Sequence, residues 1–276
     1  MRYNYNVYIK KRRHSDAKRK ESRSDILKSL GKMMTILVGT AVIVSLFWII
    51  RNFALVTPYF NIKNVVVTGN EAVPKEDIIK LTGINPGQNI FKINLVKVQY
   101  YIKENPLFDK VYVKRCLPDK IEIQVEERKA AAFLNLKGDF YLISENGVIF
   151  KKLSSFIYKN LPIISNVNLK NVILGSETNS YDLNMGLKVI KDIKSVQPEL
   201  LACISEINAG NADEIIVYTN NGIKIKVDKN TDKNKWLRVN KVISAANSEK
   251  ISIGYVDMRF NKQIVLKPAE KIKLKG

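Results

Sequence analysis

Few residues in this chain of 276 have the types and spacing that catalysis requires. Two serine–lysine pairs, Ser15 with Lys18 and Ser29 with Lys32, have the Ser-x-x-Lys spacing of the nucleophile and base in penicillin-binding enzymes. Both pairs precede a long apolar segment, and neither has the companion Ser-Asp-Asn or Lys-Thr-Gly motif. In a chain with 46 lysines and arginines, we interpret the two pairs as coincidences.

The remaining reactive side chains are also poorly placed for chemistry. His14 is the only histidine and precedes the apolar segment, so the later part of the chain has no imidazole for a Ser-His pair or a zinc site. Cys116 and Cys203 are too few for a disulfide scaffold; we expect two ordinary buried or half-buried thiols, with a single bridge as the alternative. Glu126 and Glu127 are adjacent, so on a strand they face opposite ways and cannot form an acid/base pair. The sequence therefore predicts no catalytic residue, no metal site and no cofactor.

The apolar segment runs from Met33 to Ile50 without charge or proline and extends with few interruptions to Val56. A helix needs about 20 apolar residues to cross the hydrocarbon core of a bilayer. The segment lacks a clear small-residue cleavage site, which favours an uncleaved signal anchor at 33–56 over a signal peptide; a buried helix of a soluble domain is the remaining alternative. The residues expected to mark the membrane anchor are Met33, Gly39, Phe47, Trp48 and Ile50.

Charge predicts how the anchor is oriented. Residues 1–32 contain eleven basic and three acidic side chains, and the chain as a whole has a formal charge of +20. A basic flank lies on the cytoplasmic side of most membrane spans, so we expect a cytoplasmic tail at 1–32 and extracytoplasmic domains from residue 57. The same basic tail could bind nucleic acid without reading sequence. The rest of the chain keeps 35 basic against 23 acidic residues, which makes anionic cell-wall polymers a further hypothetical partner.

The part after the anchor reads as an α+β protein in two parts. Residues 60–128 alternate in the order β-α-α-β-β: a strand ending at Gly69, a helix starting near Pro74, a helix ending before Pro106, and a hairpin of two strands. Residues 129–268 predict a mixed β domain with interspersed helices. Its expected elements are a strand–turn–strand with Asn146-Gly147 at the turn, a helix around 187–196, a hairpin with Asn221-Gly222 at its tip, a helix carrying Trp236, Val239, Val242 and Ile243 on one side, and two closing strands.

Several segments carry a resemblance. The stretches "VVVTGN", "ENPLFDKVYVKR" and "LPDKIEIQVEER" resemble a POTRA domain, and "GYVDMRF" is similar to the closing strand motif of the FtsQ/DivIB family of bacterial cell-division proteins. The resemblance covers residues 33–268. It departs from the family at "KAAAF", where a proline-alanine pair is usual. It implies a POTRA domain at 57–128, a β domain at 129–268 and a basic C-terminal tail at 269–276.

The resemblance also implies a function. Family members are membrane-anchored, non-catalytic scaffolds at the division septum, and their closing strands dock the coiled-coil division proteins FtsB or DivIC, together with FtsL. Carried over by position, the partner-binding residues are Tyr255, Arg259, Phe260, Asn261, Lys262, Gln263, Val265 and Lys267, with 263–267 as an exposed edge strand that accepts a partner.

Other interpretations stay open. Lys262 and Lys267 could serve only to protect the edge against aggregation. A POTRA-containing chaperone or translocation protein of the cell envelope is the alternative function, although such a protein needs a many-stranded barrel after the POTRA unit. A membrane-anchored hydrolase is a third class, which the absence of a histidine after the anchor disfavours.

Overall fold

The computed structural model describes residues 5–155, 160–211, 213–260 and 263–269; the side chains of 5–26 and of residue 247 are outside the description. Contacts divide the chain into two compact units. The first consists of Met1–Asn64, Asn85–Asn94 and Arg115–Lys120, and the second of Val65–Ile84, Leu95–Lys114 and Ile121–Gly276.

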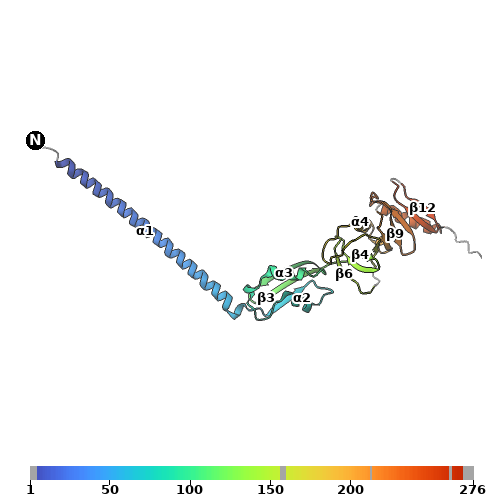
Figure 1. Ribbon diagram of the computed structural model, residues 1–276, viewed down its shortest axis with the longest axis horizontal. Helices are drawn as coiled ribbons and strands as arrows, with labels where there is room; N and C mark the ends of the chain where they lie inside the picture. Colours follow the sequence, from blue (N-terminus) through green and yellow to red (C-terminus); the bar gives the residue numbers. More distant parts are fainter. Residues whose placement is uncertain (1–4, 156–159, 212, 261–262, 270–276) are drawn as a thin grey trace, which may run out of the picture. The chain divides into compact units, whose positions relative to one another are not determined.

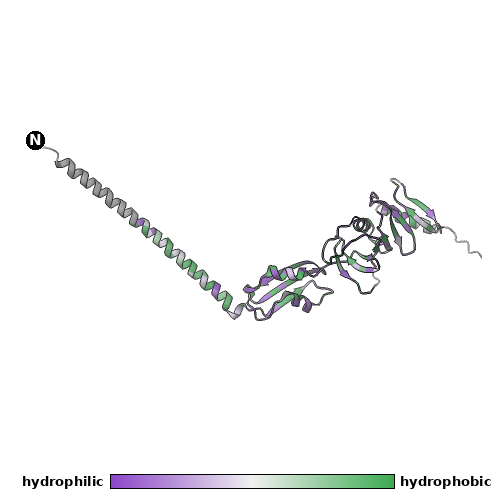
Figure 2. Cartoon of the chain, in the orientation of Figure 1, coloured by the Kyte–Doolittle hydropathy of each residue, from purple (hydrophilic) through white to green (hydrophobic). Residues whose placement is uncertain are grey.

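The first unit contains one long helix, α1 (Tyr5–Val56). Its part from Leu27 to Val56 contains an 18-residue window with a mean hydropathy of 2.4 and no buried residue, and Figure 2 shows hydrophobic colouring along this part of the helix. The expected anchor residues Met33, Phe47, Trp48 and Ile50 are all more than half exposed, and Gly39 has open space around it. A fully exposed apolar helix of this length indicates a single-pass membrane anchor. The helix runs unbroken across the predicted boundary between tail and anchor.

The order β-α-α-β-β is confirmed. The elements are β1 (Asn64–Thr68), α2 (Lys75–Thr82), α3 (Leu95–Lys103), β2 (Phe108–Cys116) and β3 (Lys120–Glu127), with short 3-10 helices η1 (Pro58–Phe60) and η2 (Ile90–Lys92). The sheet has the order β1-β3-β2, and Figure 1 shows α2 and α3 beside it. Alternate residues of β3 are buried, starting with Ile121, and Ile78 and Ile102 of the two helices are fully buried as well. This alternation is what a sheet covered on one face requires.

A tight loop joins β1 to α2. Gly69 has φ +80°, and a Cβ there would come within 2.1 Å of the carbonyl oxygen of Val125, so only glycine fits. The next three residues, 71–73, donate their backbone N–H groups to the carboxylate of Glu127 at 2.8–3.0 Å. Burial on its own raises the pKa of Glu127, but the three N–H donors outweigh it and lower the pKa below the usual value. Glu126 instead pairs with Lys110, so the two adjacent glutamates are separated as predicted.

A second sheet contains nine strands in the order β12-β11-β10-β9-β8-β7-β4-β5-β6. Its strands are β4 (Ala132–Leu136), β5 (Asp139–Ile143), β6 (Ile149–Lys152), β7 (Ile163–Ser165), β8 (Ile204–Asn208), β9 (Ile215–Thr219), β10 (Lys224–Val227), β11 (Ile253–Asp257) and β12 (Val265–Pro268). The connecting helices are α4 (Tyr181–Val196), α5 (Pro198–Leu201) and α6 (Lys235–Ser248). The pairs β4–β7, β7–β8 and β10–β11 are parallel, and the other neighbours are antiparallel.

The strand register places one row of apolar side chains across this sheet. The row contains Leu134, Ile164, Ile207, Val217, Ile225 and Val256, each fully buried and each paired with the next. Buried residues of α4 and α6, including Trp236, belong to the same core. Helix α4 begins six residues earlier than the predicted start at residue 187, because Gly186 interrupts the apolar pattern. Gly186 lies against Ile164, where an added Cβ would be only 3.0 Å from a side-chain carbon.

The predicted turns and thiols can also be compared with the structure. Gly147 and Gly222 both have positive φ, +78° and +83°, and each follows its strand as expected for a hairpin turn. Cys116 and Cys203 form no disulfide with each other. Cys116 is half-buried as expected, but Cys203 is exposed, because it lies in the turn between α5 and β8 rather than on a core-facing strand position.

The loop after β1 should depend on the charge of Glu127. We expect Glu127→Gln to accelerate hydrogen exchange of the amides of residues 71–73, because a neutral amide accepts these hydrogen bonds less strongly and the loss is about 1–2 kcal/mol. Exchange measured on the full chain in detergent by mass spectrometry checks this. The matched control is Glu126→Gln, whose single exposed ion pair should contribute almost nothing. Equal exchange in the two variants would refute the role of Glu127.

Candidate partner-binding site

The second sheet ends at β12, which pairs with β11 among the described strands. The paired residues are Val265 with Asp257, Leu266 with Val256 and Lys267 with Tyr255. Leu266 packs against the core, whereas Val265 and Lys267 are exposed on the other face. The predicted edge strand is therefore present, but it begins at Val265 rather than at residue 263. Its outer backbone edge can accept a further strand.

The face that points away from the core carries alternating lysines and tyrosines near this edge. Lys224 lies between Tyr218 and Tyr255 in the strand register, and Tyr255 in turn pairs with Lys267. The ammonium of Lys224 is 5.8 Å from the ring centre of Tyr218, and those of Lys226 and Lys267 are 5.4 and 6.0 Å from that of Tyr255. These are cation–π distances. We call these five residues the Lys/Tyr face; it presents positive charge on a flat aromatic surface.

Arg259 follows β11 and is already bound within the chain. Its Nε and Nη2 donate to the carboxylate of Asp257, with the shortest distance 2.7 Å, and its Nη1 donates to Glu214 at 3.0 Å. Glu214 also accepts from Lys226 at 2.9 Å. Two carboxylates of its own chain therefore already accept from the guanidinium of Arg259, and its assignment as a partner-binding residue stays a prediction.

The charged groups in this network shift the pKa values of one another. The hydrogen bond from Arg259 is the main cause that holds the pKa of Asp257 below its usual value, against the effect of burial. The hydrogen bond from Lys226 is the largest cause that lowers the pKa of Glu214. The hydrogen bond to Asp257 in turn raises the pKa of Arg259. All three groups therefore stay charged at neutral pH.

Lys235 fixes the backbone that follows β11. This first residue of α6 is 7% exposed, and its ammonium donates to the carbonyl oxygens of Met258 and Phe260, each at 2.8 Å. The two bonds hold the chain at the point where it leaves the sheet. The side chain of Phe260 nevertheless stays 53% exposed. Sequence reasoning missed both Lys235 and Glu214, since only folding brings them to this turn.

The predicted site residues can now be placed. Tyr255 lies on the outer face, Arg259 is held by carboxylates, and Phe260, Gln263, Val265 and Lys267 are exposed. Asn261 and Lys262 lie outside the described residues. The described members thus gather around the last two strands, with Arg259 in a supporting position.

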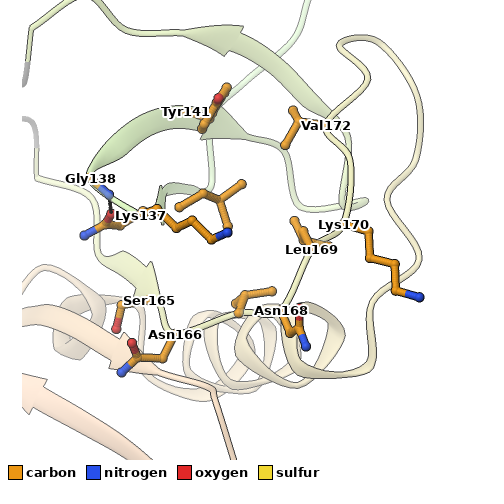
Figure 3. Close-up of a pocket in the computed structure, with 12 residues that line it drawn as sticks. Lys137, Gly138, Tyr141, Ser165, Asn166, Asn168, Leu169, Lys170 and Val172 are labelled. Carbon is orange, nitrogen blue, oxygen red and sulfur yellow. Dashed lines mark hydrogen bonds between the residues drawn. The ribbon is translucent and has the colours of Figure 1, made fainter.

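A well-defined cavity lies elsewhere, between the β4–β5 turn and the loop after β7. Figure 3 shows Lys137 on one side of this cavity of about 620 Å³ and Ser165 with Asn166 on the other. Its twelve lining residues include no histidine, cysteine or carboxylate, and the hydroxyl of Ser165 hydrogen-bonds with Glu206. The cavity therefore holds no nucleophile–base pair of the Ser-His kind. No cluster of three metal-binding side chains occurs among the described residues either.

Comparison with known proteins gives matches along most of the chain. A family model described as "POTRA domain, FtsQ-type" matches residues 60–128, and one described as "Cell division protein FtsQ/DivIB, C-terminal" matches residues 132–259. The second match ends at Arg259, so Phe260 and β12 lie beyond it.

Individual relatives extend over similar lengths. The cell division protein FtsQ of Syntrophotalea carbinolica is 26% identical over 238 residues, which cover 86% of this chain and 83% of that protein. The cell division protein DivIB of Clostridium tetani is 30% identical over 210 residues, covering 74% of this chain and 77% of that protein. Among solved structures, the major extracytoplasmic domain of DivIB from Geobacillus stearothermophilus matches 45% of this chain and 97% of its own at 16% identity, with a TM-score of 0.30. From the two family models and the relatives, the chain belongs to the FtsQ/DivIB family of cell division proteins.

Proposed function

We propose that this protein is a non-catalytic, membrane-anchored scaffold of the division machinery, and that it binds other division proteins through the edge of its second sheet. The single observation that supports the binding site is the exposed Phe260 after β11, together with β12, which pairs with no described strand other than β11. Family membership supports the role in division, and it gives no support to the alternative of a POTRA-containing translocation protein.

The anchor and the charge of the chain support a specific orientation. The basic flank at 1–32 favours a cytoplasmic N-terminus, which places the POTRA and β domains outside the cytoplasm, at the septum. The partners that fit this location are the coiled-coil division proteins of the DivIC or FtsB kind with their FtsL-like companion.

Strand addition is the mode of binding that the edge supports. A partner segment that pairs with β12 gains backbone hydrogen bonds, and its side chains then alternate between the core side and the outer face. On the outer face they meet Val265, Lys267 and the Lys/Tyr face. Because that face is cationic, we expect a partner strand with carboxylates at alternate positions. Phe260 supplies an apolar anchor at one end of the strand.

Arg259 has a positioning role in this proposal. Its hydrogen bonds to Asp257 and Glu214 connect the end of β11 to the residue before β9. With Lys235 they fix the backbone from which Phe260 projects. Removing Arg259 therefore weakens binding by loosening this turn rather than by removing a contact to the partner.

Replacing Phe260 tests the docking surface. We expect Phe260→Ala to weaken binding of a DivIC-like partner by about 2 kcal/mol, or roughly thirtyfold in Kd, as the loss of a central aromatic anchor does. The measurement is binding of the full chain in nanodiscs to the partner's purified coiled-coil ectodomain. Tyr181→Ala, at an equally exposed aromatic residue on α4, is the matched control and should leave Kd unchanged. Unchanged affinity in Phe260→Ala with an intact fold would remove the site from this edge.

Acidification tests the carboxylate network. Asp257 and Glu214 have lowered pKa values in the folded state, so their stabilising effect is present above their unfolded values, near pH 4, and is lost as pH falls through the folded values. We expect Asp257→Asn to reduce the stability of the second sheet by about 2 kcal/mol at pH 7 and to flatten this acid dependence. Urea unfolding of the full chain in detergent, followed by the fluorescence of the buried Trp236, measures both effects. Identical acid dependence in the variant and the parent would contradict the assignment.

A further inference from the structure

We infer that the first unit carries a lipid-binding surface next to the membrane anchor, which seats the beginning of the POTRA region on phospholipid headgroups. This surface, called here the juxtamembrane platform, consists of η1 (Pro58–Phe60), the segment 85–94 and the turn 115–120. The inference depends on the membrane anchor and is independent of partner binding and of which way the anchor crosses the bilayer.

The platform is fastened to the end of α1. Asn89 is 6% exposed; its Nδ2 donates to the carbonyl oxygen of Ala54 at 2.9 Å, and its Oδ1 accepts from the N–H of Phe91. The carbonyl of Ala54 is one of the last four in the helix, which have no intrahelical donor. Asn61 also forms a bridge with Asn89. The helix end and the segment 85–94 are therefore one structural unit.

A run of aromatic rings continues this connection. Phe53 of α1 packs edge-to-face on Phe60, with ring centres 6.4 Å apart, and Phe60 packs on Tyr59 and Phe91, each at 5.1 Å. Edge-to-face pairs at these distances are favourable. Phe53 and Tyr59 are about 60% exposed, so the cluster buries one side of each ring and presents the other. Tyr59 in this cluster is of a residue type that is enriched at the membrane–water interface.

The turn 115–120 lies in the same unit. The guanidinium of Arg115 donates to the carbonyl oxygens of Ile90 and Ile93, and the N–H of Lys63 donates to the carbonyl of Asp119. Leu117 stands at the tip of this turn and is 59% exposed. An exposed leucine alone needs no explanation, but here it adds to an apolar surface that already adjoins a membrane helix.

The charge of the platform suits phospholipid. In residues 51–64, 85–94 and 115–120 the basic side chains are Arg51, Lys63, Lys92, Arg115 and Lys120, and the only acidic one is Asp119. Asp119 is already paired with Lys63 at 3.0 Å. Lys92 is exposed and free to approach a phosphate. Basic residues near an anionic lipid surface are attracted to it.

The length of helix between Arg51 and the platform matches the thickness of the lipid headgroup layer. Arg51 is the first charge after the apolar core of the anchor, so it marks the boundary of the hydrocarbon. Val56, the last residue of α1, lies five residues further, or about 8 Å along the helix axis. The headgroup layer is about 5–8 Å thick on each side of the core. The platform begins immediately after Val56 and is therefore within reach of this layer, even before any helix tilt.

Spin labelling of the full chain tests the inference. A label at Leu117→Cys is prepared with Cys116→Ser and Cys203→Ser, in nanodiscs of phosphatidylcholine with or without phosphatidylglycerol. We expect the label to collide readily with oxygen and rarely with a water-soluble nickel chelate, which is the pattern of a lipid interface. A label at Ile173→Cys, also exposed but in the second unit, should show the opposite pattern. Nickel accessibility at 117 as high as at 173 would overturn the proposal.

Reversing the charge of two lysines separates the contribution of the basic residues to lipid binding from that of the apolar residues. Lys92→Glu with Lys120→Glu should raise nickel accessibility at residue 117, most strongly with phosphatidylglycerol, whereas the matched control Lys129→Glu with Lys151→Glu should leave it unchanged. An equal response in the two double variants would refute the role of the basic residues. We expect Phe260→Ala to lose partner binding while nickel accessibility at residue 117 stays low, because the lipid-binding surface does not depend on the partner-binding site.

Discussion

The buried ammonium of Lys235 is the interaction on which the arrangement of the C-terminal strands depends. It donates to two backbone carbonyls, those of Met258 and Phe260, and Lys235 is only 7% exposed. An ammonium with fewer bonds would be costly at this depth, because burying an unpaired charge opposes folding. The chain therefore has one favourable path as it leaves β11. That path decides both where Phe260 projects and where the chain can return as β12.

Hydrogen bonds between charged side chains and backbone groups also occur in other parts of the fold. Arg128 donates to the carbonyls of Pro106 and Phe108, Arg115 donates to those of Ile90 and Ile93, and Glu127 accepts from the N–H groups of the loop after β1. In each case a charged side chain forms hydrogen bonds with backbone groups. Part of the strong positive charge of this chain is therefore structural. Net charge alone overstates how much of it is available to polyanions.

The periodicity of apolar residues in the sequence was sufficient to predict the helices and strands. It did not predict the hydrogen bonds between charged side chains and the backbone. Alternation in "KIEIQVEE" gave β3 and its buried face correctly, because burial follows directly from a period of two. Helix α4 was predicted too short because Gly186 weakens the helical signal, and only the close approach to Ile164 explains that glycine. The bond from Arg259 to Glu214 was not predicted, because the two residues are 45 positions apart in the sequence. Long-range pairing of this kind leaves no trace in a single sequence.

In the proposed function the partner pairs with β12, and the two ends of this strand differ in how well they accept another strand. Pro268, the last residue of β12, has no N–H to donate, and Lys267 before it would have to be desolvated by a close partner strand. Both features protect the C-terminal end of the edge against unspecific pairing. The end at Val265 has neither, and it is the end nearer in sequence to Phe260. In the proposed function we therefore expect a partner strand at the Val265 end of β12, where Phe260 would supply an aromatic anchor on a backbone that Lys235 holds in place.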